Sequence, residues 1–179
     1  MEINLYSVSI PPLLKALKAM DKLLEKAMEH AHSKGSERQP GEKHMEAMLN
    51  DRLVFDQFPL IRQIQFMSDN AKGAVGRLAA VEVPKYEDNE KTLEELKARI
   101  DKTIKFVETI KPEQIIGRDN EKVTLAFYPD KYMTAAEYVN EFLLPNFYFH
   151  FTTAYAIMRK NGVNIGKQDF LGGLPLKDL

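Results

Sequence analysis

The chain has 179 residues, of which 44% are hydrophobic and 28% charged, and its formal net charge is −1. This length suits one domain with a sizeable core, so we treat residues 1–179 as a single domain. The balanced charge excludes the basic footprint of a nucleic-acid-binding protein and the single-sign field of a membrane-surface protein. Because the chain has no cysteine, disulfides, thiolate metal ligands and a cysteine nucleophile are excluded as well.

The N-terminus and the hydropathy pattern predict a cytoplasmic protein. Residues 1–6 lack the basic region and the apolar run of a signal peptide. No apolar stretch approaches the roughly 18–20 residues that a membrane span requires. We therefore expect neither nucleic acid nor a membrane among the partners of this protein.

The first predicted helix covers residues 11–33, where apolar residues recur with a period near 3.6. Ser9 followed by two prolines is typical of a helix start, and Gly35 is typical of a helix stop. Good helix formers over residues 43–49 predict a short helix in the polar connection that follows.

Two further long helices follow the same pattern. The second begins at Pro59 and ends before Pro84, and the third begins at Leu93 and ends before Pro112. Gly76 lies inside the second helix, where glycine costs roughly 0.5–1 kcal/mol relative to alanine. We expect it to allow close packing of a neighbouring helix.

Residues 117–133 alternate and are partly β-branched or aromatic, which predicts a short β-hairpin or an extended loop with its turn at Pro129-Asp130. Thr134 and Glu137 have the spacing of a capping box at the start of a fourth helix that runs to residue 160. Pro145 lies inside that helix and is expected to kink it, at about 3 kcal/mol. The pattern as a whole predicts an all-α four-helix bundle.

Polar side chains interrupt the apolar face of the fourth helix. Asn146, His150 and Thr153 recur at spacings of four and three, so they share the face that carries Phe142 and Ile157. Burying such groups unpaired would cost about 1–3 kcal/mol each. They are therefore expected to meet a polar partner, a water molecule or a ligand, which predicts a polar pocket inside the bundle.

The second helix offers partners for these groups. Gln65 and Asp69 are one turn apart beside its apolar stripe. We therefore expect one pocket between the second and fourth helices, lined by Gln65, Asp69, Asn146, His150 and Thr153. Carboxylate and imidazole are stronger ligands than an amide, so Asp69 and His150 are the predicted contacts of any bound metal ion.

With these residues described, the sequence resembles the DinB-like (damage-inducible, YfiT-like) superfamily of helical bundles, and within it an uncharacterised bacterial and fungal subgroup. The resemblance extends over essentially the whole chain. Its clearest segments are residues 58–63, 69–73, 77–79, 83–84, 144–157, 161–163, 166–167 and 169–172. The segment from Leu144 to Ile157 is specific to the subgroup.

The resemblance implies a four-helix bundle that is often dimeric. It also implies a divalent metal site in many relatives, with one histidine on the second helix and a His-x-x-x-His pair on the fourth. His150 matches the second histidine of that pair, and Asn146 takes the place of the first. The second-helix position falls near Gln65 or Asp69-Asn70, so this chain departs from the metal triad at two of three places.

Two functions remain open from the sequence. The first is a non-catalytic bundle that binds a small molecule in the polar pocket, with a degenerate metal site. The second is a divalent-metal-dependent enzyme of the thiol S-transferase or isomerase type, with zinc or nickel as the ion, as the resemblance implies. We also expect a homodimer, because aromatic residues lie on every side of the fourth helix and one core cannot cover them all.

Overall fold

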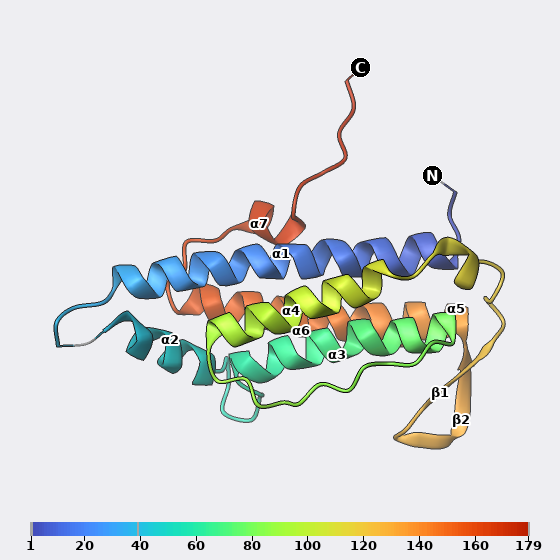
Figure 1. The fold of residues 1–179 in the computed structure, drawn as a ribbon, viewed down its shortest axis with the longest axis horizontal. Coiled ribbons are helices and arrows are strands. Elements are labelled where there is room, and N and C mark those ends of the chain that lie inside the picture. Colours follow the sequence, from blue (N-terminus) through green and yellow to red (C-terminus); the bar gives the residue numbers. More distant parts are fainter. Residues whose placement is uncertain (1, 39, 179) are drawn as a thin grey trace.

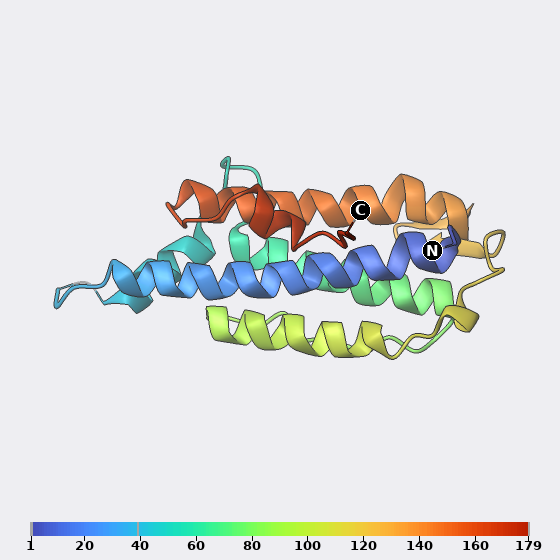
Figure 2. The same cartoon turned by 90° about the horizontal axis from the view of Figure 1, so that it is seen from above.

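The computed structural model describes residues 2–38 and 40–178 and is dominated by helices. Four long helical segments lie side by side along one axis (Figures 1 and 2). They are α1 (Leu5–Ser33), α3 (Leu60–Ala79), α4 (Leu93–Glu108) and a last segment made of α5 (Ala135–Glu137), the π-helical η2 (Tyr138–Leu143) and α6 (Leu144–Lys160). The shorter elements are α2 (Gly41–Asn50), the 3₁₀ turn η1 (Pro112–Gln114), β1 (Lys122–Leu125), β2 (Tyr128–Thr134) and α7 (Lys167–Leu171). The expected bundle is thus accompanied by two further helices, α2 and α7, which a simple four-helix count omits.

Helix α3 packs against two neighbours, with α6 on one side and α4 on the other. Helix α1 contacts α4 and α6 as well as α2 and α7. A single core runs through these contacts and includes fully buried residues from every long helix, such as Leu17, Ile64, Ile100 and Phe151. No described helix is both long enough and apolar enough to cross a membrane.

Helix α1 begins six residues earlier than the sequence pattern predicts. Asn4 is its cap, and the Asn4 side chain accepts a hydrogen bond from the backbone N–H of Ser7 at 2.9 Å. Ser9 lies within the helix and donates its hydroxyl to the carbonyl of Leu5 at 2.6 Å. The prediction of a start at Ser9 was wrong because an earlier capping box satisfies the free amides, and Pro11 and Pro12 both lie inside the helix.

The segment before the last long helix is a β-hairpin. Of the two predicted alternatives, a hairpin or an extended loop, the structure has the hairpin. β1 and β2 pair in antiparallel fashion, and the hairpin projects from the end of the bundle where α3 ends and α5 begins (Figure 1). Its turn lies at residues 126–127, so Pro129 and Asp130 belong to β2 rather than to the turn. Pro129 lies on a strand that pairs on one side only, where a missing N–H is tolerated.

The last long helix starts as its local sequence predicts. The predicted cap is confirmed: the Thr134 side chain accepts a hydrogen bond from the backbone N–H of Glu137 at 3.2 Å. The wide π turn of η2 ends at Leu143, two residues before Pro145, and the N–H of Leu144 bonds the carbonyl of Val139, five residues back. The π turn therefore shifts the backbone hydrogen-bond pattern where proline has no N–H to offer.

The connection from α3 to α4 lies against α3 itself. Ala80 ends the helix in the left-handed conformation, with φ of 54°. A Cβ placed on Gly76 would come within 2.1 Å of the Val83 side chain. Gly76 thus makes room for the following loop. The expectation that it would allow close packing of a neighbouring helix was wrong.

Candidate functional site

A polar hollow of about 250 Å³ lies between α3, α6 and the hairpin. Its lining combines charged and amide side chains with aromatic walls: Phe66, Asp69, Asn70, Arg77, Leu125, Phe127, Phe142, Asn146 and His150. Three of the five residues predicted from the sequence, Asp69, Asn146 and His150, meet here. Gln65 and Thr153 do not line this candidate pocket.

His150 is half-buried on α6 and is held in a defined orientation. Its Nδ1 lies 2.8 Å from Oε1 of Gln63 on α3. The Gln63 amide is itself oriented, because its Nε2 donates to the backbone carbonyl of Phe58 at 2.9 Å and a carbonyl can only accept. The oxygen of Gln63 therefore faces the imidazole, and Nδ1 must be the ring nitrogen that carries the proton.

The other ring nitrogen, Nε2, consequently carries a lone pair. Burial lowers the pKa of His150 below its ordinary value of 6.5, so the imidazole is neutral near neutral pH. The rings of Phe66 and Phe149 lie 5.0 Å and 5.3 Å from the imidazole ring. His150 thus presents one hydrogen-bond acceptor to the pocket, flanked by aromatic surface.

Asn146 lies one turn before His150 and is joined to α3 by a second amide. Its Nδ2 donates to Oδ1 of Asn70 at 2.7 Å. The Asn70 side chain is fixed in turn, because its Nδ2 donates to the carbonyl of Phe66 at 2.9 Å. The pair satisfies part of its bonding capacity internally and leaves the Asn146 oxygen for a ligand or water.

Asp69 lines the pocket, but its charge is already matched. Its Oδ1 lies 2.7 Å from Nη2 of Arg99 on α4 and 3.1 Å from Nζ of Lys72. The described hydrogen-bond partner of the His150 imidazole is Gln63 and not Asp69. Asp69 therefore belongs to an ion-pair cluster as well as to the pocket.

Gln65 and Thr153 serve other parts of the structure. Gln65 is buried, accepts a hydrogen bond from Arg62 at 2.7 Å and donates one to Glu90 at 2.8 Å. Thr153 donates its hydroxyl to the carbonyl of Phe149, one turn back, at 2.7 Å. Gln65 thus bonds Glu90 in the connection from α3 to α4, and the apolar stripe of α3 alone does not tell which side of the helix faces α6.

The residues of α3 at or beside the pocket that were not predicted from the sequence lie on one face of the helix. Gln63, Phe66, Asn70 and Arg77 are spaced by three, four and seven residues along this face. Leu125 and Phe127 of the hairpin also line the pocket and were not predicted. These α3 residues form a second, mostly polar stripe beside the apolar stripe of the helix. That second stripe is the sequence signal from which they could have been predicted.

Arg99 forms the ion-pair cluster that binds α4 to α3. It is only 1% exposed, and its guanidinium lies 2.7 Å from Asp69, 3.0 Å from Asp88 and 3.1 Å from Glu90. Burial lowers the pKa of Arg99, but the charges of these three carboxylates outweigh burial, and the net shift is upward. The pairing therefore keeps the arginine charged inside the protein.

The side chains that line the pocket do not fit a metal site with three protein ligands. Over residues 2–38 and 40–178, no three His, Cys, Asp or Glu side chains come together in a way that could hold an ion. His150 offers one free nitrogen, while the Asp69 carboxylate is occupied by Arg99 and Lys72. Amides stand where further ligands would be needed, and they are weak ligands for zinc-like ions.

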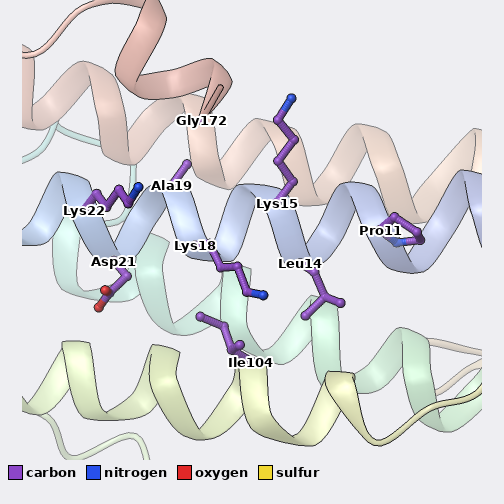
Figure 3. A pocket seen from close by; sticks show the side chains of 9 residues that line it. All are labelled: Pro11, Leu14, Lys15, Lys18, Ala19, Asp21, Lys22, Ile104 and Gly172. Atoms are coloured by element: carbon purple, nitrogen blue, oxygen red, sulfur yellow. The ribbon is translucent and has the colours of Figure 1, made fainter. Parts of the chain in front are cut away.

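A larger hollow lies elsewhere, on the outer side of α1 (Figure 3). It has a volume of about 570 Å³ and is formed by α1, Ile104 of α4 and Gly172 after α7. Its polar groups come mainly from lysines, of which Lys18 is paired with Glu108 at 2.6 Å. Histidine and amide side chains do not line it, so it lacks the converging, oriented polar groups of the α3–α6 pocket.

Comparison with known proteins agrees with this architecture. Residues 5–171 match a family model described as a domain of unknown function, DUF1993. A crystal structure of a DinB family member protein from Shewanella denitrificans is 37% identical in sequence, with a TM-score of 0.89. That similarity covers 98% of this chain and 96% of the other. No curated protein matches the sequence.

Proposed function

Because the chain belongs to the DUF1993 family and is a DinB-like protein, we propose that it binds a small molecule in the α3–α6 pocket and that the metal site of its metal-binding relatives is degenerate here. The single observation that carries this proposal is the orientation of His150. A glutamine fixed by a backbone carbonyl holds its Nδ1, and this leaves Nε2 as an acceptor at the pocket.

The surrounding groups support a binding role. Asn70 and Asn146 form a fixed amide pair beside His150, and Phe66 and Phe142 supply apolar walls. A few oriented polar groups among aromatic side chains are typical of small-molecule sites. Holding these groups in place before binding reduces the entropy that a ligand must overcome.

The alternative is a divalent-metal-dependent enzyme of the thiol S-transferase or isomerase type. One observation favours it: Asp69 and His150, the two strongest ligands of the predicted set, line the same pocket. Against it, the Asp69 carboxylate already neutralises Arg99 and Lys72. A binding site without a tight metal centre therefore fits the donor set better.

A fragment screen followed by NMR tests the proposal. We expect small polar aromatic fragments to shift the side-chain amide signals of Asn70 and Asn146, and Asn146→Leu to abolish these shifts. Thr153→Val is the matched control, because Thr153 lies on the same helix but outside the pocket, and it should bind fragments as the wild type does. Fragments that ignore the pocket, or that bind Asn146→Leu equally well, would contradict the proposal.

Metal analysis separates the two functions. Tag-free protein should contain far less than one zinc or nickel ion per chain, and titration with either ion should show no saturable site at micromolar concentration. A stoichiometric ion that is lost in His150→Ala would favour the enzyme instead.

We further propose that the protein forms a homodimer through the aromatic surface around α6. Phe149 is 52% exposed on α6, and Phe58 is 56% exposed before α3. Both lie near the pocket, since Phe149 contacts His150 and Phe58 contacts Phe66. Covering such surface is a common reason for association of two copies.

A further inference from the structure

We propose that the ligand of the candidate pocket is a single-chain anionic amphiphile, with its charged head at Arg77 and its apolar chain crossing Phe142 into a second hollow beside the hairpin. This inference rests on the proposed function, because it names the ligand class of the same pocket.

The second hollow has a volume of about 360 Å³ and lies between the hairpin and η2. Leu125 and Phe142 line both hollows, so the two share a wall. The remaining lining is mostly apolar or aromatic: Val123, Tyr128, Tyr132 and Met133, with Lys131 and Glu141 as its charged members. Polar groups therefore gather in one hollow and apolar groups in its neighbour.

The hairpin joins the two hollows. Its neighbouring residues Phe127 and Tyr128 line different hollows, Phe127 the candidate pocket and Tyr128 the second one. The Phe127 ring lies 5.8 Å from the Phe142 ring and 5.0 Å from the Tyr128 ring. An apolar chain would thus run over a continuous aromatic surface from one hollow to the next.

The charge of the polar hollow favours an anion. Arg77 is exposed at its surface, lies 5.8 Å from the Tyr138 ring, and has no carboxylate partner among the described residues. Asp69 is paired with both Arg99 and Lys72, so it does not offset Arg77. His150 is neutral near neutral pH because burial lowers its pKa. The uncompensated charge is therefore positive, and guanidinium binds a carboxylate or phosphate through two parallel hydrogen bonds.

Size also favours a ligand that extends across both hollows. Ligand pockets in proteins typically measure roughly 300–1,000 Å³. The candidate pocket, at about 250 Å³, lies below that range, and the second hollow, at about 360 Å³, lies close to its low end. A head group alone would leave the second hollow to water, whereas an attached chain would bury its apolar wall.

Lys131 is the competing cation, since it lines the apolar hollow. Glu141 lines the same hollow and opposes its charge. No oriented amide or imidazole accompanies Lys131 there, whereas Asn146 and His150 accompany Arg77. The head group is therefore assigned to Arg77.

The test uses decanoate as the probe and the ¹⁵N-labelled wild-type protein. Decanoate should shift the signals of Leu125 and Phe142 and bind at least about tenfold more tightly than decylamine, because only the anion can pair with Arg77. Butyrate should bind at least about a hundredfold more weakly, since each buried CH₂ contributes roughly fourfold.

Three variants at exposed positions locate the two ends of the probe. Arg77→Gln should weaken decanoate about tenfold or more and remove its preference over decylamine. Lys131→Gln removes the competing cation of the apolar hollow and should weaken decanoate less than Arg77→Gln does, with the preference over decylamine retained. Tyr128→Ser, from the apolar hollow, should weaken decanoate but not butyrate. Circular dichroism of each variant confirms that it is folded.

Equal binding of decanoate and decylamine, or a loss in Lys131→Gln instead of Arg77→Gln, would overturn the inference. If polar aromatic fragments bind the α3–α6 pocket but decanoate does not, the ligand class is wrong and the proposed function stands. If neither binds there, both are wrong.

Discussion

Replacing Arg99 with methionine should destabilise the protein far more than any loss of packing at that position. Methionine keeps most of the apolar length of the side chain but removes the guanidinium. Glu90, whose side chain is 6% exposed, would then lose its cationic partner and keep only the neutral amide of Gln65 as a described hydrogen-bond donor. The hydrogen bonds from Arg99 to Ser68 and to the carbonyl of Glu87 would be lost as well.

The magnitude follows from the burial of this cluster. Removing one partner of a buried ion pair typically costs about 3–5 kcal/mol, because the remaining charge stays buried without compensation. In a chain of this size, each kcal/mol lowers the melting temperature by roughly 2–4 °C, so the expected decrease is about 6–20 °C. Urea denaturation followed by circular dichroism measures the change in the free energy of unfolding directly.

Two further variants show whether the uncompensated carboxylate is the cause. Lys18→Met removes an exposed ion pair between α1 and α4, with Glu108 at 2.6 Å, and should cost only about 0–1 kcal/mol. Adding Glu90→Gln to Arg99→Met removes the buried charge and should recover at least about 1 kcal/mol. An Arg99→Met protein within about 1 kcal/mol of the wild type, or a double variant less stable than the single one, would refute the reasoning.

Three other predictions concern the pocket and the assembly. Because burial lowers the pKa of His150, the unfolded chain binds its proton more tightly, so the free energy of unfolding should fall as pH drops below about 6.5. His150→Gln should flatten this dependence between about pH 7.5 and pH 5 in urea denaturation, and an unchanged slope would show that the histidine is not responsible. Long-range ¹H–¹⁵N NMR should find the Nδ1–H tautomer of His150 in the wild type and a mixture of tautomers in Gln63→Leu; an Nε2–H tautomer in the wild type would contradict the assigned orientation. Light scattering at micromolar concentration should give the mass of a dimer, and Phe149→Arg should shift it toward that of a monomer; a monomeric wild type would end the dimer proposal.

Features set by neighbouring residues could be predicted from the sequence. Thr134 and Glu137 form their capping box within one turn, and the hairpin before them follows from a short alternating stretch. The long helices follow from their periodic apolar stripes, which need no knowledge of the partner. The start of α1 failed even though it is local, because Asn4 and Ser9 are both good caps and the pattern does not rank them.

Features set by distant residues were harder to predict. Asn146 and His150 were identified because polar groups on an apolar helix face require partners. Their partners, Asn70 and Gln63, lie 76 and 87 residues away. Which side of α3 faces α6 depends on the packing of three helices at once, and a single apolar stripe does not contain that information.

Arg99 could have been noticed in the sequence. It falls within the buried stripe of α4, which also contains Leu96, Ile100 and Thr103. A charge in that position must be paired or excluded from the core. The sequence does not name its partners, because Asp69, Asp88 and Glu90 come from another helix and from a connection without periodic pattern.

The ion-pair cluster and the pocket are linked through Asp69. By binding Arg99 and Lys72, this carboxylate is held with its charge already balanced. The same pairing that fixes α4 against α3 therefore removes the strongest acidic ligand from the pocket and leaves Arg77 as its uncompensated charge. A pocket that had kept a free carboxylate beside His150 would attract cations, whereas this arrangement favours an anionic head group. The stability of the bundle and the charge preference of its pocket thus depend on one side chain.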